Sequence, residues 1–219
     1  MSTCAILLAA GKSTRMKSLK QLLEWERKSL LEYQIDKLSA LEVKEVVVIL
    51  GHESEKLRKN VKNIKANVTF LECQNYEDGL SASLKCGLSY ASRSYRSVLI
   101  MLLDLPLIQF HTIDAVLKKG SLLMKHERET FSVQPTYMNK KGHPVFIGNF
   151  FLVDWGSLQG DMGAKPLLKQ MNKSADLSTN DTGIFFDIDT DEDYKKALEF
   201  RRKYEEVNRN ESSRITNSL

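Results

Sequence analysis

The sequence predicts an α/β protein with a mostly parallel sheet and helices on both of its faces. Across the first 125 residues, short apolar runs alternate with segments of helical periodicity. The runs are apolar at consecutive positions, as in strands that are buried on both faces. Strands that alternate with helices at this interval imply helical crossovers between parallel neighbours. After residue 125 the pattern changes, which predicts an antiparallel addition at one edge of the sheet.

The first part of the chain supplies four strands and four helices. The apolar runs predict strands over residues 5–10, 46–50, 68–71 and 98–103. The helical spacing predicts helices over residues 29–41, 53–61, 79–90 and 113–123. Ser29 opens the first of these ranges and is a good N-cap residue.

The second part continues with shorter elements. Two strands, 131–137 and 144–147, are expected around a turn at 140–142, followed by a helix over 167–171, a last strand over 183–188 and a charged helix over 191–207. No linker divides the chain, so we expect one domain over residues 1–207. Residues 208–219 are polar and without periodicity, which predicts a flexible tail.

Composition excludes several classes of protein. The longest apolar run near the start, residues 4–10, is far shorter than the ~20 residues of a membrane span and lacks the flanks of a signal peptide. The three cysteines are widely spaced, so we expect reduced thiols and a cytoplasmic protein without a membrane partner. A net charge of +4 is too mild to indicate nucleic acid.

A loop of small and cationic residues follows the first predicted strand. The candidate anion-binding residues there are Leu8, Ala9, Ala10, Gly11, Lys12, Ser13, Arg15 and Lys20. Small residues let backbone N–H groups approach an anion, and the three cations add charge where a triphosphate would lie. The spacing is not that of a Walker A loop. The alternative is an ordinary solvated loop.

Acidic residues follow the fourth and the last predicted strands. Asp104 lies just before Pro106, where ligands of open α/β sheets bind. Alternation places Asp187 and Asp189 on one face of the last strand. Asp104 and Asp189 are therefore candidate ligands for Mg²⁺. The alternative for Asp104 is a turn or capping role.

Two further segments could contact a substrate. Gly79, Ser81 and Ser83 stand at the start of a predicted helix, whose free N–H groups could read a nucleobase, although a capped helix explains Ser81 equally well. His143 and Asp161 lie in glycine-rich segments that could approach a ligand. A single histidine at a strand edge is more often structural.

Taken in order, these segments resemble the molybdenum cofactor cytidylyltransferase family. The resemblance spans residues 3–200 and rests on LLAAGKSTRMKSLKQLLEW (7–25), DGLSASLKCGL (78–88), GHPVFI (142–147) with LQGDMGAKPLL (158–168), and DIDTDEDY (187–194). The first block is shared by many nucleotidyltransferases, whereas DGLSASLKCGL and GDMGAKPLL are more specific to this branch.

The resemblance implies a Rossmann-like, three-layer α/β/α fold of the nucleotide-diphospho-sugar transferase type. It also implies transfer of CMP from CTP to the phosphate of molybdenum-molybdopterin, with a xanthine dehydrogenase-type hydroxylase as a further partner. By likeness, Gly11, Arg15 and Lys20 hold the triphosphate and Ser83 lies near the base. Asp104 and Asp189 bind Mg²⁺ by the same likeness, and the pair Ala9-Ala10 favours cytosine.

Two residues depart from the family pattern. Lys17 stands where the family has glycine, and Leu105 follows Asp104 where the family has glutamine. The second difference leaves the acceptor less certain than the nucleotide. Two alternatives therefore remain: a nucleotidyltransferase for a sugar- or polyol-phosphate, and a non-catalytic molybdopterin chaperone for a hydroxylase, whose binding would survive Asp104→Ala.

Overall fold

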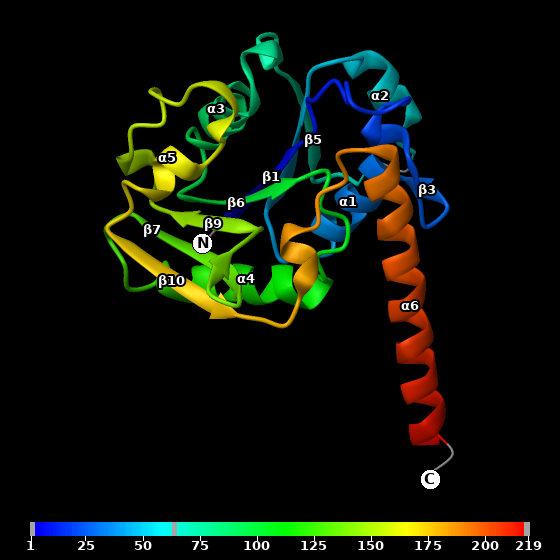
Figure 1. Ribbon diagram of the computed structural model, residues 1–219. Helices are drawn as coiled ribbons and strands as arrows, with labels where there is room; N and C mark the ends of the chain where they lie inside the picture. Colours follow the sequence, from blue (N-terminus) through cyan, green and yellow to red (C-terminus); the bar gives the residue numbers. More distant parts are fainter. Residues whose placement is uncertain (1–2, 63–64, 217–219) are drawn as a thin grey trace.

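The protein is built on one large sheet that runs through the middle of the molecule (Figure 1). The computed structural model describes residues 3–62 and 65–216. The strands are β1 (Thr3–Leu8), β4 (Glu45–Leu50), β5 (Val68–Glu72), β6 (Ser97–Leu102), β7 (Phe131–Tyr137), β8 (Lys140–Lys141), β9 (Val145–Gly148) and β10 (Lys173–Ser178). A separate hairpin joins β2 (Glu24–Trp25) and β3 (Lys28–Ser29).

The order of strands is β10-β7-β9-β6-β1-β4-β5, and β8 pairs with β7. The pairs among β1, β4, β5 and β6 are parallel, as is the pair of β10 with β7. The predicted mostly parallel sheet is therefore confirmed. We expected the antiparallel addition at an edge of the sheet, but the antiparallel strand β9 lies inside it, between β6 and β7. After β7 the chain reverses direction, and β9 fills the position between β7 and β6.

Helices cover both faces of the sheet, as predicted. The helices α1 (Leu30–Ser39) and α4 (Phe110–Leu123) pack on one face, whereas α3 (Leu80–Ala91) and α5 (Lys165–Leu168) pack on the other. The side chains of β1 alternate between the two apolar cores: Leu7 belongs to the core beneath α1, and Ile6 to the core beneath α3. The helix α2 (Ser54–Asn60) covers the first core through Leu57.

The position that we predicted for the last strand is wrong. Residues 183–188 do not form a strand: residues Thr182–Phe185 form a 3-10 turn, η5, in which Asp181 Oδ1 accepts from Gly183 N at 2.9 Å. The strand at that edge is β10, whose side chains are mostly exposed and polar. Its pairing with β7 uses the backbone, so no apolar run revealed it. The helix expected at 167–171 is α5, which lies slightly earlier.

The C-terminal helix α6 (Asp191–Thr216) extends away from the sheet (Figure 1). Thr190 caps its N-terminus: the Thr190 hydroxyl accepts from Asp193 N at 3.1 Å, and Asp193 Oδ2 accepts from Thr190 N at 2.9 Å. The helix passes residue 207, where we expected it to end. The last three residues of the expected tail lie outside the described part. Among the described helices, none is long and apolar enough to cross a membrane.

Candidate functional site

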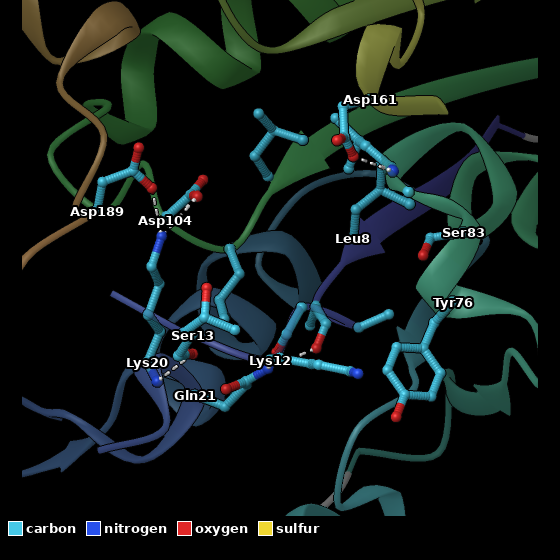
Figure 2. Close-up of a pocket in the computed structure, with 18 of the residues that line it drawn as sticks. Leu8, Lys12, Ser13, Lys20, Gln21, Tyr76, Ser83, Asp104, Asp161 and Asp189 are labelled. Atoms are coloured by element: carbon cyan, nitrogen blue, oxygen red, sulfur yellow. Dashed lines mark hydrogen bonds and ion pairs between the residues drawn. The ribbon is translucent and has the colours of Figure 1, made fainter. Parts of the chain in front are cut away.

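A cavity of about 720 Å³ opens at the carboxyl ends of β1 and β6. It is lined by every site residue predicted from the sequence except Ser81 and His143 (Figure 2). The predicted anion-binding loop thus faces the predicted acidic residues across one space. The η1 turn (Lys20–Leu22) contributes Gln21 and Tyr76 lies at the opposite end, two lining residues that sequence reasoning missed.

The loop after β1 is shaped by Ser13. This residue has a φ of 57°, in the left-handed region, and its Oγ accepts from Lys20 N at 2.9 Å. Gly11, by contrast, does not adopt a positive φ, and a Cβ built on it would meet no protein atom within 4 Å. The glycine is therefore not required by packing within the protein, which leaves open space beside the backbone for a ligand.

Lysine and arginine side chains meet two carboxylates at one end of the cavity. Lys20 Nζ lies 2.6 Å from Asp189 Oδ1 and 3.3 Å from Asp104 Oδ2. Arg15 Nη2 lies 2.7 Å from Asp189 Oδ2. The Lys20 side chain is 13% exposed and both carboxylates are 27% exposed, so the cluster is partly screened from solvent.

The two acids respond differently to this environment. Burial raises the pKa of Asp104, and the charge of Lys20 offsets this only in part. Partial burial also opposes ionisation of Asp189, but its contacts with Lys20 and Arg15 outweigh this effect and lower its pKa. The cluster therefore holds at least one firmly ionised carboxylate beside the cations.

Backbone pairing brings the two acids together. Asp104 follows β6, and its carbonyl accepts from Ile188 N at 2.9 Å, which places Asp189 beside it. We expected Asp187 and Asp189 on one face of a strand; instead both belong to an irregular segment after η5. Both nevertheless line the cavity.

The other end of the cavity is formed where two glycine-containing segments pack together. Gly79 has a φ of 100°, and a Cβ on it would lie 2.6 Å from the backbone carbon of Gly160. Asp161 Oδ1 accepts from Leu80 N at 3.1 Å, at the N-terminus of α3. This N–H group is therefore occupied by the protein and is not free to read a base, in contrast to our expectation. Ser83 lines the cavity one turn further along α3.

Lys12 lines the cavity and pairs with an acidic residue beside an aromatic ring. Its Nζ lies 2.5 Å from Glu77 Oε1 and 5.8 Å from the centre of the Tyr76 ring. Both partners stand in or beside the η2 turn (Tyr76–Asp78). The exposed ion pair is one that a more highly charged anion could displace.

Two predicted residues lie outside the cavity lining. Ser81 is fully buried, and its Oγ donates to the carbonyl of Gln159 at 3.1 Å, so its hydroxyl fixes the neighbouring loop. This corrects the expectation that Ser81 reads a base. Burial lowers the pKa of His143 to about 4, and a polar contact with the backbone of Ile100 opposes this only in part. The contact of His143 with a substrate phosphate stays a prediction.

The acidic pair suits a hard cation that a substrate helps to hold. Among residues 3–62 and 65–203, there is no group of three or more His, Cys, Asp or Glu side chains arranged for a metal. Mg²⁺ commonly binds through one or two carboxylates together with substrate phosphates. Asp104 and Asp189 fit this mode, because their oxygens already lie around one cation, the Lys20 ammonium.

A family model described as "MobA-like NTP transferase domain" matches residues 5–175. The chain belongs to this family. It is accordingly a nucleotidyltransferase of the MobA-like type. The matched region contains most of β1, the loop after it, Asp104 and the segment around Asp161, whereas Asp189 lies beyond it.

Two relatives match this chain over different lengths. The molybdenum cofactor cytidylyltransferase of Escherichia coli is 25% identical over 203 residues, which cover 92% of this chain and 97% of that protein. The bifunctional protein GlmU of Staphylococcus epidermidis is 29% identical over 128 residues, or 58% of this chain. The matched region is only 28% of GlmU.

Solved structures share the fold. Rv0371c from Mycobacterium tuberculosis has a TM-score of 0.72 at 21% identity, covering 91% of this chain and 99% of that one. The same protein in complex with manganese gives a TM-score of 0.69 at 21% identity, with the same coverage. A CMP:2-keto-3-deoxy-manno-octonic acid synthetase complexed with CTP gives 0.66 at 11% identity, covering 93% and 100%.

Proposed function

We propose that this chain is a Mg²⁺-dependent cytidylyltransferase of the cytoplasm. It transfers CMP from CTP to the terminal phosphate of molybdenum-bound molybdopterin and releases pyrophosphate. The observation that carries the proposal is the meeting of Arg15 and Lys20 with Asp104 and Asp189 in one cavity beside the loop after β1. The near full-length likeness to the Escherichia coli cytidylyltransferase supports the choice of nucleotide and acceptor.

The triphosphate would lie along the loop after β1. Arg15, Lys20 and Lys12 would contact its oxygens, with help from backbone N–H groups at Gly11 and Ser13. All three cations are paired with acids in the free protein. Nucleotide binding would thus exchange protein carboxylates for phosphate oxygens, without bringing an unpaired cation into the cavity.

Asp104 and Asp189 would hold the divalent ion. When bound, Mg²⁺ would neutralise charge on the phosphate oxygens of the transferring group and of the leaving pyrophosphate. Once its carboxylate partners bind the ion, Lys20 would turn to the phosphates. The manganese complex of a protein with the same fold is consistent with a divalent-ion requirement.

The nucleobase would lie at the end of the cavity where Gly79, Ser83 and Asp161 stand. Ser83 offers a hydroxyl that can donate to or accept from the polar edge of cytosine. Leu8, Ala9 and Ala10 also line the cavity. The small side chains of Ala9 and Ala10 leave the room that the proposed cytosine needs.

The reaction itself needs no protein nucleophile. An oxygen of the acceptor phosphate attacks the α-phosphorus of CTP, and the bond from that phosphorus to the bridging oxygen of the β-phosphate breaks. Pyrophosphate carries away the electron pair. The protein contributes position and charge neutralisation, which are the main terms in phosphoryl transfer.

The acceptor defines the second candidate function. The fold is shared with an enzyme whose name specifies a sugar acid, the CMP:2-keto-3-deoxy-manno-octonic acid synthetase above. Leu105, which departs from the family pattern, is buried in the core and does not face the cavity. Lys17 is exposed and outside the cavity lining. Neither departure therefore argues against molybdopterin. A xanthine dehydrogenase-type hydroxylase would receive the product.

The test is a matrix of pyrophosphate release. Purified protein is incubated with CTP, GTP, ATP or UTP, each with molybdenum-molybdopterin or a panel of sugar- and polyol-phosphates, with and without Mg²⁺. We expect release from CTP with molybdopterin and Mg²⁺. Release only with a sugar- or polyol-phosphate supports the second candidate. Molybdopterin binding that survives Asp104→Ala, without release from any nucleotide, would establish the chaperone alternative.

A further inference from the structure

A buried glutamine lies directly behind the loop after β1. Gln21 belongs to the η1 turn and is 1% exposed. Its Nε2 donates to two loop carbonyls, that of Ala9 at 2.8 Å and that of Gly11 at 2.9 Å. Figure 2 shows this side chain beside Lys12 and Ser13. A single carboxamide thus holds both carbonyls that flank Ala10.

The carbonyl between them is also occupied. Ala10 O accepts from His52 N at 3.3 Å. Three successive carbonyls at the start of the loop are therefore bonded to protein donors. Within the part of the chain that the structure describes, the N–H groups on these three peptide units, those of Ala10, Gly11 and Lys12, bond to no protein acceptor. The carbonyl groups of the loop are thus bonded to the protein, whereas its N–H groups are left without a protein partner.

This polarity decides what the loop can bind. A peptide unit has a negative carbonyl oxygen and a positive N–H group, so an anion is attracted only when the N–H side faces it. If one of these peptide units turned over, a carbonyl would point at the phosphate and would also block a neighbouring donor. Each held carbonyl therefore fixes the direction of the N–H group on its own peptide unit: Ala9 O fixes that of Ala10, Ala10 O that of Gly11, and Gly11 O that of Lys12.

We propose that Gln21 is a positioning residue for polyphosphate binding. Its carboxamide fixes the carbonyls of Ala9 and Gly11 and thereby turns the N–H groups on the same two peptide units, those of Ala10 and Lys12, toward the phosphates. This inference rests on the proposed function only for the identity of the anion, the triphosphate of a nucleotide. It assigns to Gln21 no contact with the reacting atoms.

Two substitutions remove the donor while keeping the volume of the side chain. Gln21→Met has no hydrogen-bonding group, and Gln21→Glu presents a carboxylate to the two carbonyls. Gln134→Met is the matched control, because Gln134 is also buried and also donates to a carbonyl, that of Gly142 at 3.3 Å, outside the cavity lining. Thermal melting of each variant identifies any that fail to fold.

The readout is binding of inorganic tripolyphosphate and of CTP by calorimetry, without any acceptor. Loss of two hydrogen bonds predicts affinities weaker by roughly tenfold to thirtyfold in both Gln21 variants. Cytidine, which lacks phosphates, should bind as tightly to Gln21→Met as to the wild type. In steady-state assays the KM for CTP should rise more than kcat falls. Gln134→Met should bind all three ligands unchanged.

A measurement on the wild-type protein covers the case in which both variants fail to fold. Tripolyphosphate should shift the backbone ¹⁵N–¹H resonances of Ala10, Gly11 and Lys12 more than those elsewhere in the chain. Unchanged resonances there, or folded Gln21 variants with wild-type affinity for tripolyphosphate, would overturn the inference. If the wild type bound neither tripolyphosphate nor CTP, the proposed function would fail, and not the role of Gln21 alone.

Discussion

The Lys20 ammonium lies 2.6 Å from Asp189 Oδ1, although 169 positions of the chain separate the two residues. The same Nζ lies 3.3 Å from Asp104 Oδ2, so it stands between the two carboxylates that we propose as metal ligands. A positive charge is thus present where the divalent ion would bind. In the free protein, the Lys20 ammonium pairs with both Asp104 and Asp189. A divalent ion must therefore displace this ammonium in order to bind the two carboxylates.

We predict that the divalent ion and the nucleotide bind together. An ion that arrives alone must displace Lys20 and leave its ammonium without an acid, whereas CTP supplies phosphates for Lys20. Electron paramagnetic resonance of Mn²⁺ measures the free ion directly. The affinity for Mn²⁺ should rise at least tenfold when CTP is present, and Lys20→Met should reduce this difference. Equal Mn²⁺ affinity with and without CTP would contradict the arrangement.

Removing one carboxylate should abolish catalysis without unfolding the protein. We expect Asp104→Asn to lower kcat by about 10² to 10³, the usual cost of losing an electrostatic contact to the reacting group. The asparagine keeps the shape of the side chain, so the melting temperature should change little. Asp176→Asn is the matched control, because Asp176 pairs with Lys141 on the outer strands. Similar loss of activity in both variants would show that the effect is not local.

The loop that carries Asp104 depends on a buried lysine of α1. Lys37 Nζ donates to the carbonyls of Pro106 at 2.7 Å and Ile108 at 2.9 Å. Burial lowers the pKa of Lys37 to about 7, from 10.5. Between these values the unfolded chain holds a proton that the folded protein lacks, so the free energy of unfolding should rise with pH in this window.

Denaturant unfolding at pH 7 and 9 tests this dependence on Lys37. The contribution to the slope is at most about 1.4 kcal/mol per pH unit. Lys37→Met should remove that contribution, whereas Lys118→Met, which alters an exposed ion pair with Asp114, should leave it. Parallel pH profiles for the wild type and Lys37→Met would show that Lys37 stays charged in the folded protein.

Two glycines at the cavity should respond in opposite ways to alanine. Gly79→Ala forces a positive φ on a side chain that also meets the backbone of Gly160, so we expect a loss of about 1–3 kcal/mol in stability. Gly11→Ala meets no protein atom and should leave stability unchanged. Its Cβ would compete with the phosphates, so CTP should bind more weakly. Chemical unfolding and calorimetry measure the two effects separately, and equal destabilisation by both changes would contradict this assignment.

The sequence predicted the buried strands and the acidic end of the cavity because these features depend on local pattern. The apolar run that ends in Ala9 and Ala10 indicated a buried strand followed by a loop of small residues, and β1 occupies most of it. The strand β10 was missed because its polar side chains carry no periodic signal and its pairing comes from the backbone. The stretch around Ile184 was mistaken for a strand because burial in a 3-10 turn gives the same apolar composition.

The roles of single polar side chains could not be predicted in the same way. Ser81 and Ser83 are equivalent in the sequence, and only the packing of the Gln159 loop on α3 directs Ser81 away from the cavity. Gln21 gave no signal, since a glutamine after Lys20 looks like a surface residue until the turn of η1 buries it. Such roles depend on contacts between distant segments.

The most direct test of the account is the crystal structure of the protein soaked with CTP and Mg²⁺. We predict that the triphosphate lies along the loop after β1, in contact with Arg15 and Lys20. A metal ion should bind both to phosphate oxygens and to Asp104 and Asp189. Electron density for the nucleotide elsewhere on the molecule, with the ion pair of Lys20 and Asp189 intact, would contradict the account.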